Sequence, residues 1–206
     1  MTELFISAFI TFLVIIDPPG CAPIFASLTT GVPRDLRRSM AIRAVVVGTV
    51  ILFTFALFGE QFLKALGISL DAFRIAGGIM LFLIALEMVF ERRTQRREDR
   101  AQKVIDDDDV EDVSVFPMAM PMIAGPGSIA SIMLMMARSD GLAQTLVVLA
   151  AMFSVMAITL VALLLAGPLM QVVGPRIEVV ITRLLGVVLA ALAAQFVIDG
   201  INASFG

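Results

Sequence analysis

The chain has 206 residues, of which 59% are hydrophobic and 16% are charged, and its formal net charge at pH 7 is -3. This apolar share lies well above the roughly 45–50% of a soluble domain, so the composition predicts an integral membrane protein and excludes an ordinary soluble globular domain. The absence of histidine removes the commonest metal ligand, and a single cysteine excludes a disulfide within the chain.

Apolar stretches divide the chain into six predicted membrane segments, each long enough to span a bilayer. They cover residues 4–28, 41–58, 73–90, 115–136, 142–165 and 179–198. Glu3 and the lack of a basic n-region favour a retained first segment over a signal peptide. We therefore expect an all-α integral membrane protein that forms a single transmembrane domain over residues 1–206.

The first segment is interrupted near its middle by the run Asp17-Pro18-Pro19-Gly20. Proline removes a backbone donor and clashes with the preceding turn, so the run breaks the helix. A helix broken at mid-membrane depth is tolerated where protein buries the break or a watery cavity meets it. Asp17 is the only carboxylate deep in an apolar segment. Two compatible roles are open for it: it carries a proton or binds Na⁺, or it caps the next half-helix.

Basic residues gather in two connections, which sets the expected orientation in the membrane. Arg34, Arg37, Arg38 and Arg43 follow the first segment, and Arg92, Arg93, Arg96, Arg97, Arg100 and Lys103 follow the third. Because basic connections face the cytoplasm, we expect both termini to lie outside. Residues 91–114 are then a cytoplasmic loop, and we interpret its acidic run, Asp106 to Asp109, as solvated.

The fourth segment is interrupted in its turn by Ala124-Gly125-Pro126-Gly127. This break and the first one fall at corresponding places, as do Arg74 in the third segment and Arg183 in the sixth. Because three helices per unit invert the second unit, we predict two inverted three-helix repeats, over about 1–90 and 115–206, each with a broken first helix. Such paired breaks indicate a transporter site. The alternative is a chance similarity between proline-kinked helices.

Two broken helices at one depth offer a distinctive chemistry. Each break frees backbone carbonyls at the end of one half-helix and N–H groups at the start of the next. A carboxylate favours the N–H groups and a cation favours the carbonyls, which suits a small zwitterion such as an amino acid. We predict that substrate and ion contact Asp17, Pro18, Pro19, Gly20, Cys21, Ala124, Gly125, Pro126, Gly127 and Ser128.

Three polar residues outside the breaks are candidates for a gate or counter-charge, namely Arg74, Arg183 and Gln195. For the two arginines the alternative is that the side chain snorkels to the membrane interface. For Gln195 the alternative is a hydrogen bond across helices.

Three stretches of the chain resemble the MarC family of membrane proteins. Residues 17–25 (DPPGCAPIF) resemble its first-helix signature, residues 116–129 (FPMAMPMIAGPGSI) look like its second, and residues 181–186 with 195–201 are similar to its last helix. The resemblance spans essentially the whole chain. It implies a UPF0056-type protein of a bacterial or archaeal cytoplasmic (inner) membrane, related to the neutral amino acid transporter group that includes SnatA. That group implies glycine and alanine as substrates and coupling to an ion gradient. Cys21 stands where relatives often carry asparagine, which weakens or removes a polar contact expected there.

We therefore expect a secondary transporter of small neutral amino acids or similar small metabolites, coupled to a proton or sodium gradient. The expected partners are the substrate, H⁺ or Na⁺ and the lipid bilayer. Nucleic acid, cofactors, and metal other than Na⁺ near Asp17 are not expected, nor is an enzyme, because no catalytic set is visible. The alternative is a non-transporting membrane protein of stress tolerance or assembly. The small residues Gly186, Ala190 and Ala194 leave a homo-oligomer open.

Overall fold

The computed structural model describes residues 1–105 and 112–205, with side chains outside residues 169–178. All secondary-structure elements of the described residues are helices. They are α1 (Thr2–Ile16), α2 (Pro18–Leu28), α3 (Arg34–Ala65), α4 (Leu70–Val89), α5 (Arg92–Ile105), η1 (Ser114–Ile123), α6 (Pro126–Ala137), α7 (Gly141–Leu164) and α8 (Ala166–Phe205). The prediction of an all-α membrane protein is confirmed.

Membrane-spanning helices are found where the hydropathy pattern predicts them. Five spans are long and apolar enough to cross a membrane within the described residues, at 2–28, 34–65, 70–89, 141–164 and 179–205. The pair η1 and α6, bent by 52° at its break, is a sixth if it counts as one span.

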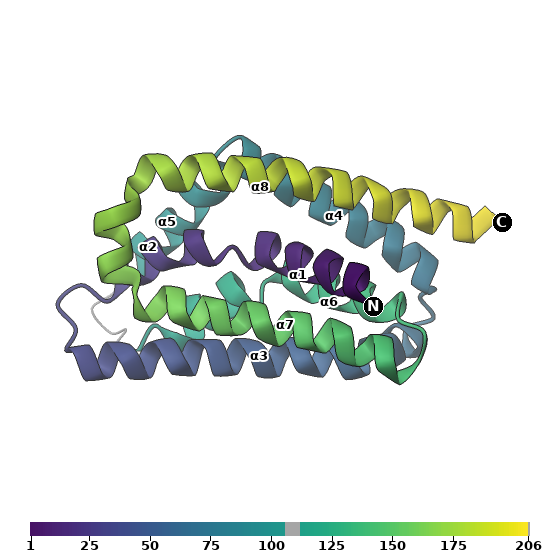
Figure 1. The fold of residues 1–206 in the computed structure, drawn as a ribbon, viewed down its shortest axis with the longest axis horizontal. Coiled ribbons are helices and arrows are strands. Elements are labelled where there is room, and N and C mark those ends of the chain that lie inside the picture. The colour runs from purple at the N-terminus through teal and green to yellow at the C-terminus, as the bar shows by residue number, and fades with distance from the viewer. Residues whose placement is uncertain (106–111, 206) are drawn as a thin grey trace.

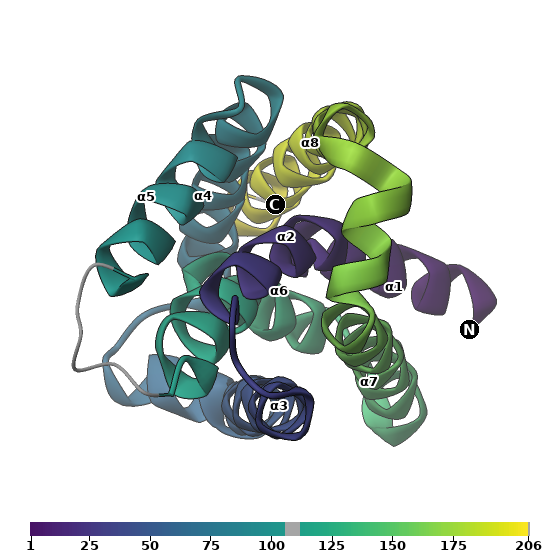
Figure 2. The same ribbon diagram turned by 90° about the vertical axis from the view of Figure 1, so that its left-hand side faces the viewer.

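The two interrupted segments lie in the middle of the helix bundle. In Figure 1, α1 and α2 run between α3 and α7 below and α4 and α8 above. Figure 2, an end view, places α2 and α6 at the centre with the longer helices around them. In the apolar part of the α1–α2 span 56% of residues are buried, compared with 28% in α4. The breaks are therefore enclosed by protein rather than by lipid, as broken backbone requires.

The first interruption is a single residue. Asp17 adopts the left-handed conformation (φ 58°, ψ 64°), so that it ends α1 and begins α2. Its N–H still donates to the carbonyl of Leu13 at 3.0 Å, and Pro18 follows at the first helical position, where a missing N–H costs nothing. The two helices continue as one span.

The second interruption is longer and bends the chain. Phe116 and Met120 are extended inside η1, and each precedes a proline, which disfavours helical backbone at the residue before it. The chain then turns into α6, which begins at Pro126 after the N-cap residue Gly125.

The stretch that we predicted as a loop, residues 91–114, contains helix α5 in its described part. Arg97, Ala101 and Val104 are the buried residues of α5, and their spacing of three and four places them on one helical face. Packing of this face against the bundle explains why a polar sequence is helical here. The acidic run Asp106 to Asp109 lies outside the described residues.

Candidate functional site

The first break is held by a buried ion pair. The Asp17 carboxylate accepts a hydrogen bond from the N–H of Gly20 at 3.1 Å, which caps α2. Its other oxygen lies 2.9 Å from Nη1 of Arg97. The two side chains are only 3% and 8% exposed. The cap predicted for Asp17 is therefore present, and the charge of the carboxylate is balanced by an arginine of α5.

Guanidinium groups of α5 also cover the carbonyl end of α1. Nη2 of Arg93 donates to the carbonyl of Ile15, and Nη2 of Arg97 makes a long contact of 3.5 Å with the carbonyl of Ile16. The Cys21 thiol donates to the same Ile16 carbonyl at 3.4 Å. Because these carbonyls have no helical partners, the arginines supply donors that the broken helix lacks.

A cavity of about 320 Å³ lies beside this ion pair and next to the second break. Residues of α1, α4, η1 and α6 form its walls, and α5 contributes four arginines. Its lining includes Ile15 near the first break, Gly125, Pro126, Gly127 and Ser128 at the second, and Glu87, Arg93, Arg96, Arg97 and Arg100. The volume is at the low end of the range for small-molecule sites, about 300–1,000 Å³.

The N-terminus of α6 forms one wall of the cavity. Gly125 is its N-cap residue and makes no side-chain cap, so the first N–H groups of α6 have no capping side chain. Gly127 is packed closely: a Cβ there would lie 2.6 Å from Cδ1 of Ile84 and 3.4 Å from Cγ2 of Ile15. The two breaks therefore approach each other, and glycine allows this approach.

Positive charge exceeds negative charge around the cavity. Arg96 pairs with Glu87, and Arg97 pairs with Asp17 behind the wall. Arg93 and Arg100 form no ion pair with any residue that the structure describes. Burial, and then repulsion by Arg97, lowers the pKa of Arg93 to about 10, so this guanidinium stays protonated at neutral pH. The arrangement can bind an anionic group through charge-assisted hydrogen bonds.

The structure separates the predicted site residues into two groups. Gly125, Pro126, Gly127 and Ser128 line the cavity. The others are not among its lining residues: Asp17, Pro18, Gly20, Cys21 and Ala124 are buried nearby, and Pro19 is half-buried. Across residues 1–105 and 112–205, no group of three His, Cys, Asp or Glu side chains could hold a metal ion.

The sequence reasoning missed Arg93 and Arg97 as site residues. Both were counted only as basic residues that orient the chain. A signal was present, because Arg93, Arg97, Ala101 and Val104 recur at helical spacing and so predict one face of a helix.

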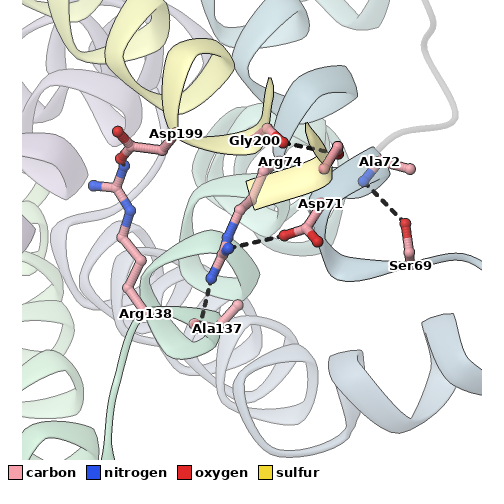
Figure 3. Close-up of polar contacts among 9 residues, drawn as sticks. Ser69, Asp71, Ala72, Arg74, Ala137, Arg138, Asp199 and Gly200 are labelled. Atoms are coloured by element: carbon pink, nitrogen blue, oxygen red, sulfur yellow. Dashed lines mark hydrogen bonds and ion pairs between the residues drawn. The ribbon is translucent and has the colours of Figure 1, made fainter. Parts of the chain in front are cut away.

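The candidate gate residues lie at opposite ends of the bundle. Figure 3 shows Arg74 directed at Asp71, 3.0 Å away, and at the carbonyl of Ala137 at 3.1 Å, where it caps the end of α6. Arg183 instead pairs with Glu91 just before α5.

Gln195 donates to Asp199 in its own helix at 2.6 Å, and Asp199 pairs with Arg138. Figure 3 shows this Arg138–Asp199 contact beside Arg74. None of Arg74, Arg183 and Gln195 is among the residues that line the cavity between the breaks.

The chain is similar to one family of membrane proteins over nearly its whole length. Residues 2–205 match the model described as MarC family integral membrane protein. A UPF0056 membrane protein of Methanocaldococcus jannaschii is 38% identical over 203 residues, which are 97% of each chain. The UPF0056 membrane protein YvbG of Bacillus subtilis is 31% identical over 210 residues, 100% of this chain and 97% of the relative. No solved structure matches the chain.

Proposed function

Because this chain belongs to the MarC family of integral membrane proteins, we propose that it is a secondary transporter of small neutral amino acids or similar small metabolites, coupled to a proton or sodium gradient. Glycine and alanine are the first substrates to test, since the resemblance to the SnatA-containing transporter group implies them. The chain is a multi-pass membrane protein with relatives in archaea and bacteria.

The cavity between the two broken segments is the observation that carries this proposal. It lies against Ile15 near the first break and Gly125 to Ser128 at the second. Interrupted helices around a buried site are the arrangement that many secondary transporters use to bind substrate. Under this proposal the two halves of the chain are inverted repeats, both termini lie outside, and α5 lies on the cytoplasmic face.

Asp17 is the residue proposed to couple transport to an ion. Both of its carboxylate oxygens have partners, Gly20 and Arg97. A proton or Na⁺ would therefore act by competing with Arg97 for the carboxylate, which would release α5 from the first break. Transport would then require the ion pair to open and close in each cycle.

Uptake of labelled glycine and alanine into proteoliposomes, under imposed proton or sodium gradients, tests the transport function. Saturable uptake that collapses with one of the gradients supports it and identifies the ion. Robust reconstitution without uptake of any small metabolite rejects it in favour of a non-transporting membrane protein. The variant Asp17→Asn tests the coupling role: unchanged flux with unchanged pH and Na⁺ dependence would rule that role out.

A further inference from the structure

We propose that the cavity binds a small oxyanion with net negative charge, carried by a carboxylate or a phosphate group, through Arg93, Arg100 and the N-terminus of α6. This inference rests on the proposed function, because it concerns the same cavity. Among the small metabolites of the proposed function, it favours an anion over a neutral amino acid.

The balance of charges is the first reason. Four arginines and one carboxylate line the cavity, and a second carboxylate, Asp17, lies behind it. Two arginines are matched by these two carboxylates, as Arg96–Glu87 and Arg97–Asp17. Arg93 and Arg100 have no carboxylate partner among the described residues. The cavity therefore carries two positive charges that a ligand can balance.

Arg93 is the more constrained of these two cations. It is half-buried, and its hydrogen-bond partners are neutral: the carbonyl of Ile15, and the thioether of Met88 at 3.0 Å. A guanidinium presents five N–H donors in a fixed fork, of which these contacts use two. A cation partly removed from water without an anion in hydrogen-bond contact is unfavourable, so an oxyanion on the remaining donors would stabilise the site.

The backbone adds donors from another part of the cavity wall. Gly127 and Ser128 belong to the first turn of α6, where N–H groups have no helical acceptor and no side chain caps them. The positive end of the helix dipole points the same way. Arginines and N–H groups of the same cavity would hold an oxyanion together.

The acceptors near the breaks explain why a net anion is favoured over a zwitterion. An ammonium group needs acceptors, and the ones at the first break already accept hydrogen bonds from arginine, as does the one carboxylate of the cavity lining. The carbonyls of Ile15 and Ile16 accept from Arg93 and Arg97, and Glu87 pairs with Arg96. An amino acid would therefore bind by its carboxylate and leave its ammonium group facing a cationic wall.

Calorimetric titration of the full-length protein in phosphatidylcholine nanodiscs tests the inference. The probes are succinate, inorganic phosphate and glycine, at fixed ionic strength because salt screens these charges. We expect saturable binding of succinate or phosphate, and binding of glycine weaker by about tenfold or more. Glycine that binds as tightly as both anions would overturn the inference.

Two arginine variants and one control assign the binding to this cavity. Arg93→Gln should weaken anion binding about tenfold, and Arg100→Gln about fivefold because Arg100 is exposed. Arg38→Gln removes an exposed arginine of α3 that does not line the cavity, and it should leave affinity unchanged. If Arg93→Gln fails to fold, Arg100→Gln decides the outcome alone. Equal affinities in Arg100→Gln and Arg38→Gln would contradict the proposal.

A lipid headgroup is an alternative source of the same chemistry. Native mass spectrometry can count the phosphatidylglycerol molecules that the wild type and Arg93→Gln retain. A lipid that is retained only by the wild type and displaced by succinate identifies the headgroup as the oxyanion. Binding of succinate without any displaced lipid identifies a soluble anion.

The titration and the uptake assay fail independently of each other. Saturable glycine uptake without anion binding would overturn this inference and leave the transport function standing. Arginine-dependent anion binding without flux of any probe would support this inference and reject the transport function.

Discussion

Oδ2 of Asp17 and Nη1 of Arg97 lie 2.9 Å apart in the interior of the bundle, although 80 residues separate them in the sequence. The pair joins the left-handed residue that breaks the first span to a helix that a polar sequence would place in solvent. It thereby fixes α5 on the broken helix and sets one wall of the cavity.

Breaking this pair should destabilise the protein strongly. We expect Asp17→Asn to lower the free energy of unfolding by about 3 kcal/mol, because Arg97 would remain buried without a counter-charge. Unfolding in mixed micelles with increasing denaturing detergent measures the change. Glu60→Gln is the control, since it breaks an exposed pair with Lys64 and should cost less than about 1 kcal/mol. The double variant Asp17→Asn with Arg97→Gln should lose less unfolding free energy than the sum of the losses in the two single variants. Equal losses in Asp17→Asn and Glu60→Gln would show that the pair contributes nothing.

Adding one methyl group at Gly20 should act through the same carboxylate. A Cβ at Gly20 would lie 2.3 Å from Oδ2 of Asp17, so Gly20→Ala forces the carboxylate away from Arg97. Helix propensity alone predicts a gain of about 0.5–1 kcal/mol, whereas the clash predicts a loss of about 1–3 kcal/mol. Thermal unfolding of the variant and the wild type shows whether the substitution stabilises or destabilises the protein. Gly167→Ala serves as the comparison, because its Cβ would meet no atom closer than 3.9 Å and should be neutral or stabilising.

The polar cluster at the other end of the bundle should affect stability and leave anion binding unchanged. Arg138 pairs with Asp199 and lies 4.2 Å from the ring centroid of Phe196. Arg138→Gln should cost about 1–2 kcal/mol of unfolding free energy, since the pair is partly exposed. Titration with succinate should give the wild-type affinity. A large loss of affinity in this variant would indicate that the two ends of the bundle are coupled.

The pH dependence of anion binding follows from Arg93. Burial, and then repulsion by Arg97, lowers its pKa well below the usual range of arginine, to about 10. The unfolded chain therefore binds more protons from about pH 10 up to that usual range, so that this group makes stability rise with pH there and contributes no slope at lower pH. Sulfate keeps its charge over the range of the measurement. Its affinity should stay constant between about pH 6 and 9, and fall as pH passes about 10 and Arg93 loses its proton. The other charged groups around Arg93 are Asp17, Glu87, Arg96, Arg97 and Arg100. A tenfold loss of affinity centred near neutral pH would show that another group controls binding.

Hydropathy and local backbone chemistry are sufficient to predict most of the fold. Backbone groups that face lipid must be paired within the protein, and a helix pairs them inside its own segment, so long apolar stretches specify spans independently of their neighbours. The breaks at Asp17 and at Gly125 can also be predicted from the local sequence, because proline and glycine act on the backbone of their own turn. The cap at Ser69, which accepts from the N–H of Ala72 at 3.1 Å, is local too.

The composition of the site was decided by tertiary structure. Arg93 and Arg97 fit the positive-inside rule whether they lie in solvent or in the bundle. The sequence alone therefore does not predict which residues they contact. Packing of α5 brings them to the carbonyl end of α1, and the bend between η1 and α6 brings the second break to the same place. The sequence therefore determined where the helices break. Long-range pairing of charges determined that the space between the breaks is cationic, because an ion pair depends on distance in space and carries no signature in the spacing of residues along the chain.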